Sequence, residues 1–587
     1  MSAYSSRAVG DCRTAGAGRV GQRAHGVGTG PPLPMSMRTL ASIRSVSKRA
    51  NALKIQHRRY SDNAGVKPYY VTTPIFYPNA APHIGHLHSL VVADIFARHA
   101  KLVDPGRPVR FVTGTDEHGL KLQNAAKAKG MEPLAFCDQL SEHFRNLTQK
   151  ANATNTRFLR TTERQHAEAV SHLWKELEAR GLIYKGQHAG WYSISDETFY
   201  PPGQVEARNQ DGEEYYISTT SRSRVEWQEE ENYKFRLSAF QSALIEHYTA
   251  HPGAVQPPQF HADVIKALQE PLEDLSISRL RSRLSWGIPV PNDSKHTIYV
   301  WIDALTCYLS AVEYPWSATG GKGHSVGWPP DVQVIGKDIL RFHAIYFPAM
   351  LKALDLPLSR TLLTHSHWTV ERTKMSKSLG NVADPIKAID EIGLDIVRFY
   401  LARVGGRFKD DVDWSEEQLQ KHSREITSLL GNLYMRAASA KITKRVSGIP
   451  KPTVTAISES TAFAPLIAAL KGLAPTYEAN MRSFQLADAV DTVILALQEA
   501  NLLMTQAAPW SPETSPAVAA DVQALMFEAL RICGILLRPI MPGKADFLLD
   551  SLDVPPAERT LADADFGKRS VGSVRSGVRL FDVERKP

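Results

Sequence analysis

Residues 69–86, which read YYVTTPIFYPNAAPHIGH, decide the fold of this chain. The bulky and β-branched residues at 69–73 predict a buried strand, and a helix is expected from about Gly85 to Leu102. A second apolar stretch at 109–113 ends at Gly114 and again leads into a helical pattern. Strands that alternate with helices in this way predict parallel βαβ units and a doubly wound sheet.

The alternation is interrupted and later resumes. Residues 188–296 carry short aromatic strands, scattered turns and two expected helices, whereas strands are again expected at 297–301 and 332–336. Beyond about residue 420, apolar residues recur at helical spacing, as in 490–497. We therefore predict an α/β fold, in which a Rossmann-like doubly wound parallel sheet is split by an inserted connective domain and followed by an all-α helix bundle.

The positive charge of the chain is concentrated at its start. The formal net charge is +8, but residues 1–60 contain nine Arg and two Lys against one acidic residue, so the remainder carries about −2. The chain after residue 60 is therefore not basic, and its net charge gives no evidence that it binds nucleic acid. Between Met35 and Leu53, apolar residues recur at three- and four-residue steps with basic residues between them, which is typical of a mitochondrial transit peptide. Residues 58–61 (RRYS) resemble a matrix-processing site, so we expect a protein of the mitochondrial matrix; a basic tail without a targeting role is the alternative.

Hydropathy and cysteine usage argue against a membrane-spanning protein and against a metal site built from paired cysteines. No run of 18 or more apolar residues exists, so we expect no membrane-spanning segment. The cysteines Cys12, Cys137, Cys307 and Cys533 are more than a hundred residues apart, so no pair has the spacing of metal ligands. This usage suits a reducing compartment.

Two histidines stand where the first helix is expected to begin. His83 and His86 flank Ile84 and Gly85 at the end of the quoted stretch. Amide groups at a helix N-terminus favour anions, imidazoles donate hydrogen bonds to phosphates, and a glycine lets a flat ligand approach the backbone. The pattern predicts an anion site, although two surface histidines that cap a helix would leave the same short motif.

A lysine-rich loop, KMSKSLGN, lies far downstream at 374–381. Lys374 and Lys377 are three residues apart and are interleaved with Met375, Ser376 and Ser378. Such a cationic loop suits a developing pyrophosphate, whereas plain solvated surface is the ordinary reading of a short Lys/Ser loop. Because both motifs lie at the ends of βα units in one chain, we predict that they serve one site.

Together, the two motifs resemble the HIGH and KMSKS signatures of class I aminoacyl-tRNA synthetases, and the rest of the chain resembles a methionyl-tRNA synthetase of the mitochondrial type. The resemblance runs from about Tyr69 to about Pro542. It includes VTGTDEHG at 112–119, WGIPVP at 286–291, YVWIDAL at 299–305 and GKDILRFH at 336–343. It implies an enzyme that activates methionine with ATP to methionyl-adenylate, releases pyrophosphate, and transfers the methionyl group to the 3′-terminal adenosine of tRNA(Met).

The resemblance also implies which residues bind the substrates. ATP, as its Mg²⁺ complex, is expected at His83, Gly85, His86, Gly336, Asp338, Lys374, Met375, Ser376, Lys377 and Ser378. The catalytic residues among these are expected to be His83, His86, Lys374 and Lys377, which would hold the phosphates and stabilise the transition state. Methionine is expected at Ile75, Tyr77, Asp116, Trp301, Ala304, Leu305, Tyr308, Ile339, His343 and Phe347. Asp116 would pair with the α-ammonium group, with a helix cap as its alternative role, and core packing is an equal alternative for Ile75, Leu305 and Ile339.

In the bundle, the resemblance implies that Asn432, Arg436 and Trp510 bind the anticodon. Asn432 and Arg436 are spaced i, i+4 and so share one face of a helix. An aromatic plane, a guanidinium and an amide suit splayed single-stranded bases. An exposed polar pair beside a packed tryptophan is the alternative.

The chain departs from the family pattern at two positions. Ser193 and Asp196 stand where many members carry a Cys-x-x-Cys zinc knuckle, and neither side chain is a thiolate, so we predict no structural zinc. Ser366 replaces a glycine that is usual beside the adenine. The chain also lacks the appended domain through which some members dimerise, so we expect a monomer.

These inferences divide the chain into six parts. They are a transit peptide at 1–60, the first half of the catalytic domain at 61–187, a zinc-free inserted connective domain at 188–296, the second half with the KMSKS loop at 297–384, a stem-contact or linker region at 385–425, and an anticodon-binding helix bundle at 426–587. Synthetases for valine, leucine and isoleucine need a larger editing insertion, and the cysteine enzyme needs zinc thiolates. A non-catalytic tRNA-binding or regulatory paralogue is the remaining alternative.

Overall fold

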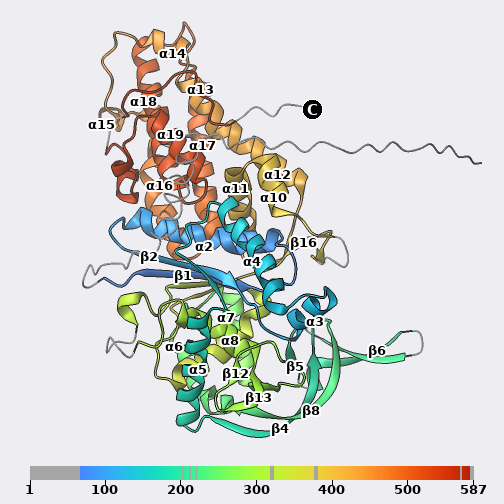
Figure 1. Ribbon diagram of the computed structural model, residues 1–587. Helices are drawn as coiled ribbons and strands as arrows, with labels where there is room; N and C mark the ends of the chain where they lie inside the picture. Colours follow the sequence, from blue (N-terminus) through green and yellow to red (C-terminus); the bar gives the residue numbers. More distant parts are fainter. Residues whose placement is uncertain are drawn as a thin grey trace, which may run out of the picture. The chain divides into compact units, whose positions relative to one another are not determined.

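The computed structural model describes residues 66–200, 202–210, 213–219, 221–316, 323–375, 381–568 and 571–581, without the side chain of Lys374 (Figure 1). The expected transit peptide therefore lies outside the described residues. So do Ser376, Lys377 and Ser378 of the lysine-rich loop.

A six-stranded, entirely parallel sheet forms the centre of the described part. Its strands, in spatial order, are β3 (Arg157–Arg160), β2 (Val109–Thr115), β1 (Tyr69–Phe76), β14 (Val332–Gly336), β15 (Leu362–His365) and β9 (Val255–Gln256). Helix α2 (Ile84–Val103) connects β1 to β2, and α3 (Leu120–Ala128) follows β2. The predicted α/β fold with a doubly wound parallel sheet is confirmed.

Both faces of the sheet are covered by other elements. Neighbouring residues of a strand point to opposite faces, so they contribute to two different cores. In β1, Val71 contributes to a core that continues through α2 into the bundle, whereas Tyr70 contributes to a second core on the opposite face. Phe111 and Val112 of β2 divide in the same way. Figure 1 accordingly shows the bundle helices on the α2 side and the inserted strands beyond the other side.

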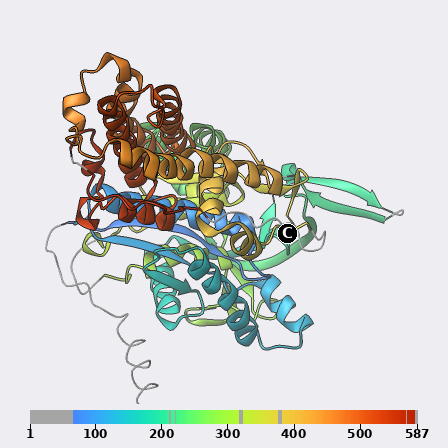
Figure 2. The same ribbon diagram turned by 90° about the horizontal axis from the view of Figure 1, so that it is seen from above.

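The segment between the two halves of the sheet is mostly antiparallel. Its strands, in spatial order, are β5 (Thr198–Tyr200), β4 (Ile183–Ser193), β8 (Arg224–Phe235), β7 (Glu213–Ser218) and β6 (Val205–Gln210). The hairpin of β6 and β7 extends away from the neighbouring elements in both views (Figures 1 and 2). The two expected helices are α6 (Gln241–Ala250) and α7 (Pro258–Gln269). Between them, β9 crosses back and pairs in parallel with β15 at the edge of the main sheet.

The predicted strand at 297–301 is wrong in its second half. Strand β13 (Asp293–Ile298) ends before Tyr299, and α8 (Val300–Ser310) begins directly after it. Strand β13 is also antiparallel and belongs to a separate three-stranded sheet with β11 (Ser278–Leu280) and β12 (Pro289–Val290). The buried, β-branched and aromatic character of these residues suits a strand and a buried helix equally, so composition did not separate the two.

The C-terminal part is helical, as predicted. Its principal helices are α11 (Leu394–Gly405), α12 (Glu416–Ile426), α13 (Leu433–Ala437), α16 (Ala464–Arg482), α17 (Leu486–Ala507), α18 (Pro516–Leu537) and α19 (Pro542–Ser551). A fully buried ion pair between Asp94 of α2 and Arg398 of α11, 2.7 Å long, joins this part to the sheet. Within the described ranges, no helix is both long and apolar enough to cross a membrane.

Candidate active site

The two histidines of the first motif form the N-terminal cap of α2. His83 Nδ1 accepts a hydrogen bond from Gly85 N at 3.0 Å, and His86 Nδ1 accepts one from His83 N at 3.0 Å. The two rings stack with their centroids 3.8 Å apart. Because both Nδ1 atoms accept, each neutral ring carries its proton on Nε2. The histidines therefore cap the helix and, through the same hydrogen bonds, hold two Nε2–H donors at a helix N-terminus that favours anions.

Gly85 is required by this arrangement. A Cβ atom at this position would lie 2.9 Å from Cε1 of His83, too close for the stacked ring to stay where it is. The glycine thus supports the histidine geometry directly, in addition to the open backbone that the sequence suggested.

The next strands bring further predicted residues to the same edge of the sheet. Gly336 ends β14 and is paired in register with His365 at the end of β15. Asp338 follows, and its Oδ1 lies 3.3 Å from Nε2 of His367. Ser366, the departure from the family pattern, is buried and donates from Oγ to the carbonyl of Lys409 at 2.8 Å. The buried hydroxyl group of Ser366 therefore has a hydrogen-bond partner.

The structure describes the lysine-rich loop at its two ends, Lys374 and Met375 at the start and Asn381 at the end. Lys374 ends the short strand β17 (Thr373–Lys374), which pairs with β16 (Trp368–Val370) beyond β15. Met375 is buried in the core that contains α2. The loop therefore begins at the elements that follow β15, and its residues 376–380 lie outside the described part of the chain.

Asp116 directly follows β2 and is 8% exposed. Its backbone N donates to the carbonyl of Phe76 at 2.9 Å, and the Phe76 ring packs against His86 with centroids 5.2 Å apart. The Asp116 carboxylate therefore belongs to the same edge as the capped histidines. Its Oδ1 has no hydrogen-bond partner among the residues that the structure describes.

The electrostatic surroundings of Asp116 favour a positively charged partner. Burial raises the pKa of Asp116 well above its ordinary value, and the nearby carboxylates of Asp303, Glu197 and Glu117 raise it further. A buried acid that is surrounded by acids gains from a positively charged partner. The arrangement suits an ammonium group.

A buried network beneath Asp116 was missed by the sequence reasoning. Asp303 of α8 contacts His118 Nδ1 and His166 Nε2, each at 2.6 Å. Burial opposes ionisation, but the two histidines lower the pKa of Asp303 to about 2. His118 and Asp303 both lie in the quoted motifs, so the buried, polar positions within those motifs were the available signal.

The residues predicted for the methionine side chain lie on β1, on α8 and around the helix that follows β14. Trp301 stacks on Phe342 with ring centroids 3.6 Å apart. Tyr308 and His343 share a hydrogen bond of 2.8 Å between Oη and Nε2, and His343 Nδ1 lies 2.9 Å from the carbonyl of Ile339. Burial lowers the pKa of His343 to about 4, so the ring is neutral at physiological pH. The buried Leu305 and Phe347 belong to the same core, and the partly buried Ile75 packs against it. Ala304 is also buried.

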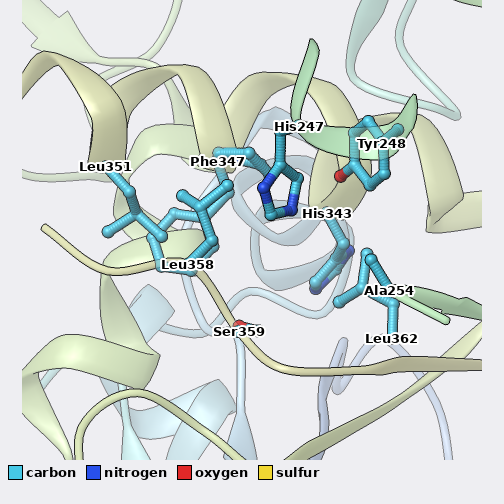
Figure 3. A pocket seen from close by; sticks show the side chains of 10 residues that line it. His247, Tyr248, Ala254, His343, Phe347, Leu351, Leu358, Ser359 and Leu362 are labelled. Atoms are coloured by element: carbon cyan, nitrogen blue, oxygen red, sulfur yellow. The ribbon is translucent and has the colours of Figure 1, made fainter. Parts of the chain in front are cut away.

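Figure 3 shows His343 from the side that faces α6 and α9 (Phe347–Ala353). His343, His247, Tyr248 and Phe347 line a cavity of about 10 Å³ there. This volume is close to the minimum that holds one water molecule, so the cavity is a packing gap and not an amino-acid site. A larger cavity of about 530 Å³, lined by the start of α11, by α12 and by α19, contains none of the predicted site residues.

In the bundle, the structure brings two of the three predicted anticodon residues together. The Arg436 guanidinium lies 5.0 Å from the ring centroid of Trp510, and its Nη2 donates to Thr505 Oγ1 at 3.2 Å. Asn432 is exposed one turn earlier, at the end of a π-helical turn (Thr427–Asn432). An arginine in contact with a tryptophan ring is an arrangement that suits stacking on a base.

Hydroxyl groups surround the predicted zinc-free turn. Ser193 Oγ accepts from Asp196 N at 3.2 Å, and Ser218 Oγ accepts from Ser221 N at 3.2 Å. The Asp196 carboxylate accepts from Tyr200, Ser221 and Ser223. This donor set does not fit zinc, because it contains no thiolate or imidazole and its carboxylate is occupied by hydroxyl donors. Within the described ranges, no group of three His, Cys, Asp or Glu side chains is placed to hold a metal ion.

Comparison with known proteins identifies the class to which a protein with this fold and this candidate site belongs. Residues 69–438 match the family model of the class I (M) tRNA synthetases, and the chain belongs to that family. It is 43% identical to a probable mitochondrial methionine–tRNA ligase of Neurospora crassa over 522 residues, which cover 85% of this chain and 83% of the relative. It is 40% identical to the human mitochondrial methionine–tRNA ligase over 532 residues, which cover 87% of this chain and 88% of that protein. The crystal structure of Mycobacterium tuberculosis methionyl-tRNA synthetase bound by methionyl-adenylate aligns with a TM-score of 0.81 at 35% identity, over 88% of this chain and 100% of that one.

Proposed function

We propose that the chain is a mitochondrial methionine–tRNA ligase. It activates methionine with ATP to methionyl-adenylate, releases pyrophosphate, and transfers the methionyl group to the 3′-terminal adenosine of tRNA(Met). The observation that carries the proposal is the buried carboxylate of Asp116. Its Oδ1 has no hydrogen-bond partner within the described ranges, and Asp116 adjoins the histidine cap of α2 through Phe76. A cation site beside an anion site suits an amino acid and the phosphates of ATP.

In the first step, the methionine carboxylate attacks the α-phosphate of ATP and pyrophosphate leaves from the opposite side. Such a reaction depends on positioning and on charge stabilisation. Asp116 pairs with the α-ammonium group, while the Nε2–H groups of His83 and His86 donate to the phosphates of ATP, which enters as its Mg²⁺ complex. Asp338 accepts from the ribose hydroxyls beside Gly336. Lys374 and Lys377, with Met375, Ser376 and Ser378, stabilise the departing pyrophosphate.

We propose that the methionine side chain binds among the residues predicted for it. The supporting observations are the neutral His343, its hydrogen bond with Tyr308, and the stack of Trp301 on Phe342. Aromatic walls suit the polarizable thioether. The tRNA anticodon is read by Asn432, Arg436 and Trp510, and supporting this is the contact between Arg436 and Trp510.

We also propose an oligomeric state, a location and a domain organisation for the chain. The chain acts as a monomer in the mitochondrial matrix without a structural zinc, and its functional parts follow the six boundaries given above. The amphipathic leader supports the location, and the hydroxyl contacts of Asp196 support the absence of zinc.

Methionine-dependent exchange of pyrophosphate into ATP tests the function. The purified chain, with residues 1–60 removed, should catalyse exchange with methionine and not with leucine, and should charge tRNA(Met). Absence of exchange, with tRNA binding retained, would instead support the non-catalytic paralogue. Equal exchange with leucine would refute the methionine specificity.

A further inference from the structure

Glu197 reaches from the inserted sheet into the predicted methionine site. It lies in the turn between β4 and β5, yet it is 6% exposed because its side chain extends to the catalytic domain. Its Oε1 accepts hydrogen bonds from Lys121 N at 2.6 Å and from the Tyr77 hydroxyl at 3.1 Å. The Tyr77 oxygen in turn accepts from Leu122 N at 3.3 Å. One carboxylate therefore connects the inserted sheet, the start of α3 and an aromatic residue that the site needs.

The backbone on both sides is shaped for this contact. Helix α3 begins after Gly119, which provides no side-chain cap, and Glu197 supplies the missing acceptor from a distant part of the chain. A Cβ atom at Gly119 would lie 2.2 Å from Oε2 of Glu197, and the φ of +113° at Gly119 also favours glycine. Glu197 itself has a φ of 50°, which is uncommon for a residue with a side chain. Such a conformation persists where surrounding contacts hold it, as the contacts with Lys121 and Tyr77 do here.

We propose that Glu197 is a positioning residue for methionine recognition, through which the inserted domain fixes the Tyr77 side chain and the N-terminus of α3 at the amino-acid site. The proposal rests on the proposed function, in which Tyr77 contacts methionine. Glu197 acts through Tyr77 and through the negative charge that it adds near Asp116. No role in the in-line attack itself is assigned to it.

The charged and titratable groups that face Glu197 come from every neighbouring element. They are Tyr77 after β1, Asp116 after β2, Lys121 on α3, Tyr192 on β4 and Arg279 on β11. Arg279 is itself held between the rings of Tyr192, Phe199 and Tyr299, at 4.5 to 5.2 Å from their centroids. Burial raises the pKa of Glu197 to about 7, while the Lys121 backbone, Tyr77, Lys121 and Arg279 oppose the rise.

This balance gives methionine binding a specific pH dependence. Above pH 7 the carboxylate accepts both hydrogen bonds and adds negative charge to the ammonium site. As the pH falls through about 7, Glu197 takes up a proton, the hydrogen bond from Tyr77 weakens, and the charge is lost. Both changes weaken methionine binding, so the KM for methionine should rise as the pH falls, while the KM for ATP should not follow.

The test compares Glu197→Gln with Glu226→Gln in methionine-dependent pyrophosphate exchange between pH 6 and pH 8.5. Glu226 is an exposed carboxylate on β8 of the same sheet and serves as the matched control. At pH 8, we expect Glu197→Gln to raise the KM for methionine about tenfold, the usual scale for one hydrogen bond to a charged group, with kcat and the KM for ATP nearly unchanged. The rise of KM below pH 7 should disappear in Glu197→Gln and remain in Glu226→Gln.

Tyr77→Phe removes the same hydrogen bond from the other partner and keeps the test decisive if Glu197→Gln folds poorly. Because the two residues act through one contact, the double variant should raise the KM by less than the product of the single effects. Additive effects, or a pH dependence that persists in Glu197→Gln and so belongs to another group such as Asp116, would overturn the proposal. A wild-type chain without methionine exchange would instead refute the proposed function, so the two failures are distinguishable.

Discussion

At the scale of single residues, the buried carboxylate of Asp116 would gain stability from a positively charged ligand. Taking a carboxylate out of water costs free energy that a paired cation restores, and the surrounding acids increase that cost. We expect Asp116→Asn to lower kcat/KM for methionine in pyrophosphate exchange by about 100-fold or more, which corresponds to about 3 kcal/mol. Asp390→Asn, which changes an exposed carboxylate paired with Lys150, should leave exchange unchanged. A normal KM for methionine in Asp116→Asn would show that the ammonium group binds elsewhere.

A substitution at Trp510 tests the proposed anticodon site in the helix bundle. Replacing it with alanine removes the stacking plane and the partner that holds Arg436. Because stacking contributes about 1–3 kcal/mol per base, kcat/KM for tRNA in aminoacylation should fall about tenfold or more. Methionine-dependent exchange, which needs no tRNA, should be spared. Trp227→Ala, at a half-exposed tryptophan of the inserted sheet, is the control, and equal loss of exchange and aminoacylation in Trp510→Ala would contradict the anticodon role.

The two histidines of the α2 cap, which the sequence predicted, have partners nearby in the chain, whereas Glu197 and Asp303, which it did not predict as site residues, have distant partners. The cap of α2 lies within four consecutive residues, so the motif itself showed both histidines and the glycine that they need. Glu197 meets Tyr77 across 120 residues, and Asp303 meets His118 across 185. No local pattern encodes such pairs, because the tertiary fold alone brings them together.

At the scale of elements, hydroxyl groups surround the Asp196 carboxylate in the antiparallel sheet of β4, β5 and β8. Asp196 accepts from three hydroxyls on β5 and in the turn before β8, so its loss would leave those donors without a carboxylate. We expect Asp196→Ala to lower stability by about 1–3 kcal/mol. We also expect that treatment with a strong chelator, followed by removal of the chelator and return of Mg²⁺, leaves the melting temperature and the exchange rate of the wild-type chain unchanged. Release of about one zinc per chain, measured by elemental analysis, would contradict this prediction.

The sequence predicted the order of elements better than their edges. The alternation of apolar strands and helices predicted β1, α2, β2 and β14 because each strand is a mostly buried run and the helix is 20 residues long. It failed at Tyr299, where β13 ends and α8 begins within a continuous buried run. It also missed β9, since a strand of two residues inside an inserted segment has no periodicity.

At the scale of the whole molecule, placed charges matter more than net charge. Residues 1–60 carry about +10, so the remaining chain holds its polyanionic substrate with a nearly neutral body. The joint between the sheet and the bundle is also built from charge. Arg398 of α11 pairs with Asp94 of α2 and donates to the carbonyls of Ala151, Pro539 and Ile540, with both charged side chains fully buried. The helix that begins with the two site histidines is thereby fixed to the bundle.

This joint should make global stability sensitive to a single residue and to acid. Among the described residues, Arg398→Ala would leave the buried Asp94 with Arg98 as its one cationic partner, and we expect it to lower the free energy of unfolding by about 3–5 kcal/mol. Burial alone would raise the pKa of Asp94, but Arg398 and Arg98 lower it below its ordinary value. The stabilisation is therefore complete above the unfolded-state pKa of about 4 and is lost as the pH falls through the lower folded-state value. Urea unfolding at pH 7 and at pH 3 measures both effects.

Arg164→Ala is the matched control, because Arg164 forms an exposed ion pair with Glu168 and should change stability by less than about 0.5 kcal/mol. The difference in stability between Arg398→Ala and the wild type should also narrow at the lower pH, since protonation removes the charge that Arg398 compensates. Equal losses in Arg398→Ala and Arg164→Ala, or a difference that does not depend on pH, would show that apolar packing between α2 and α11 holds the two parts together without the buried pair.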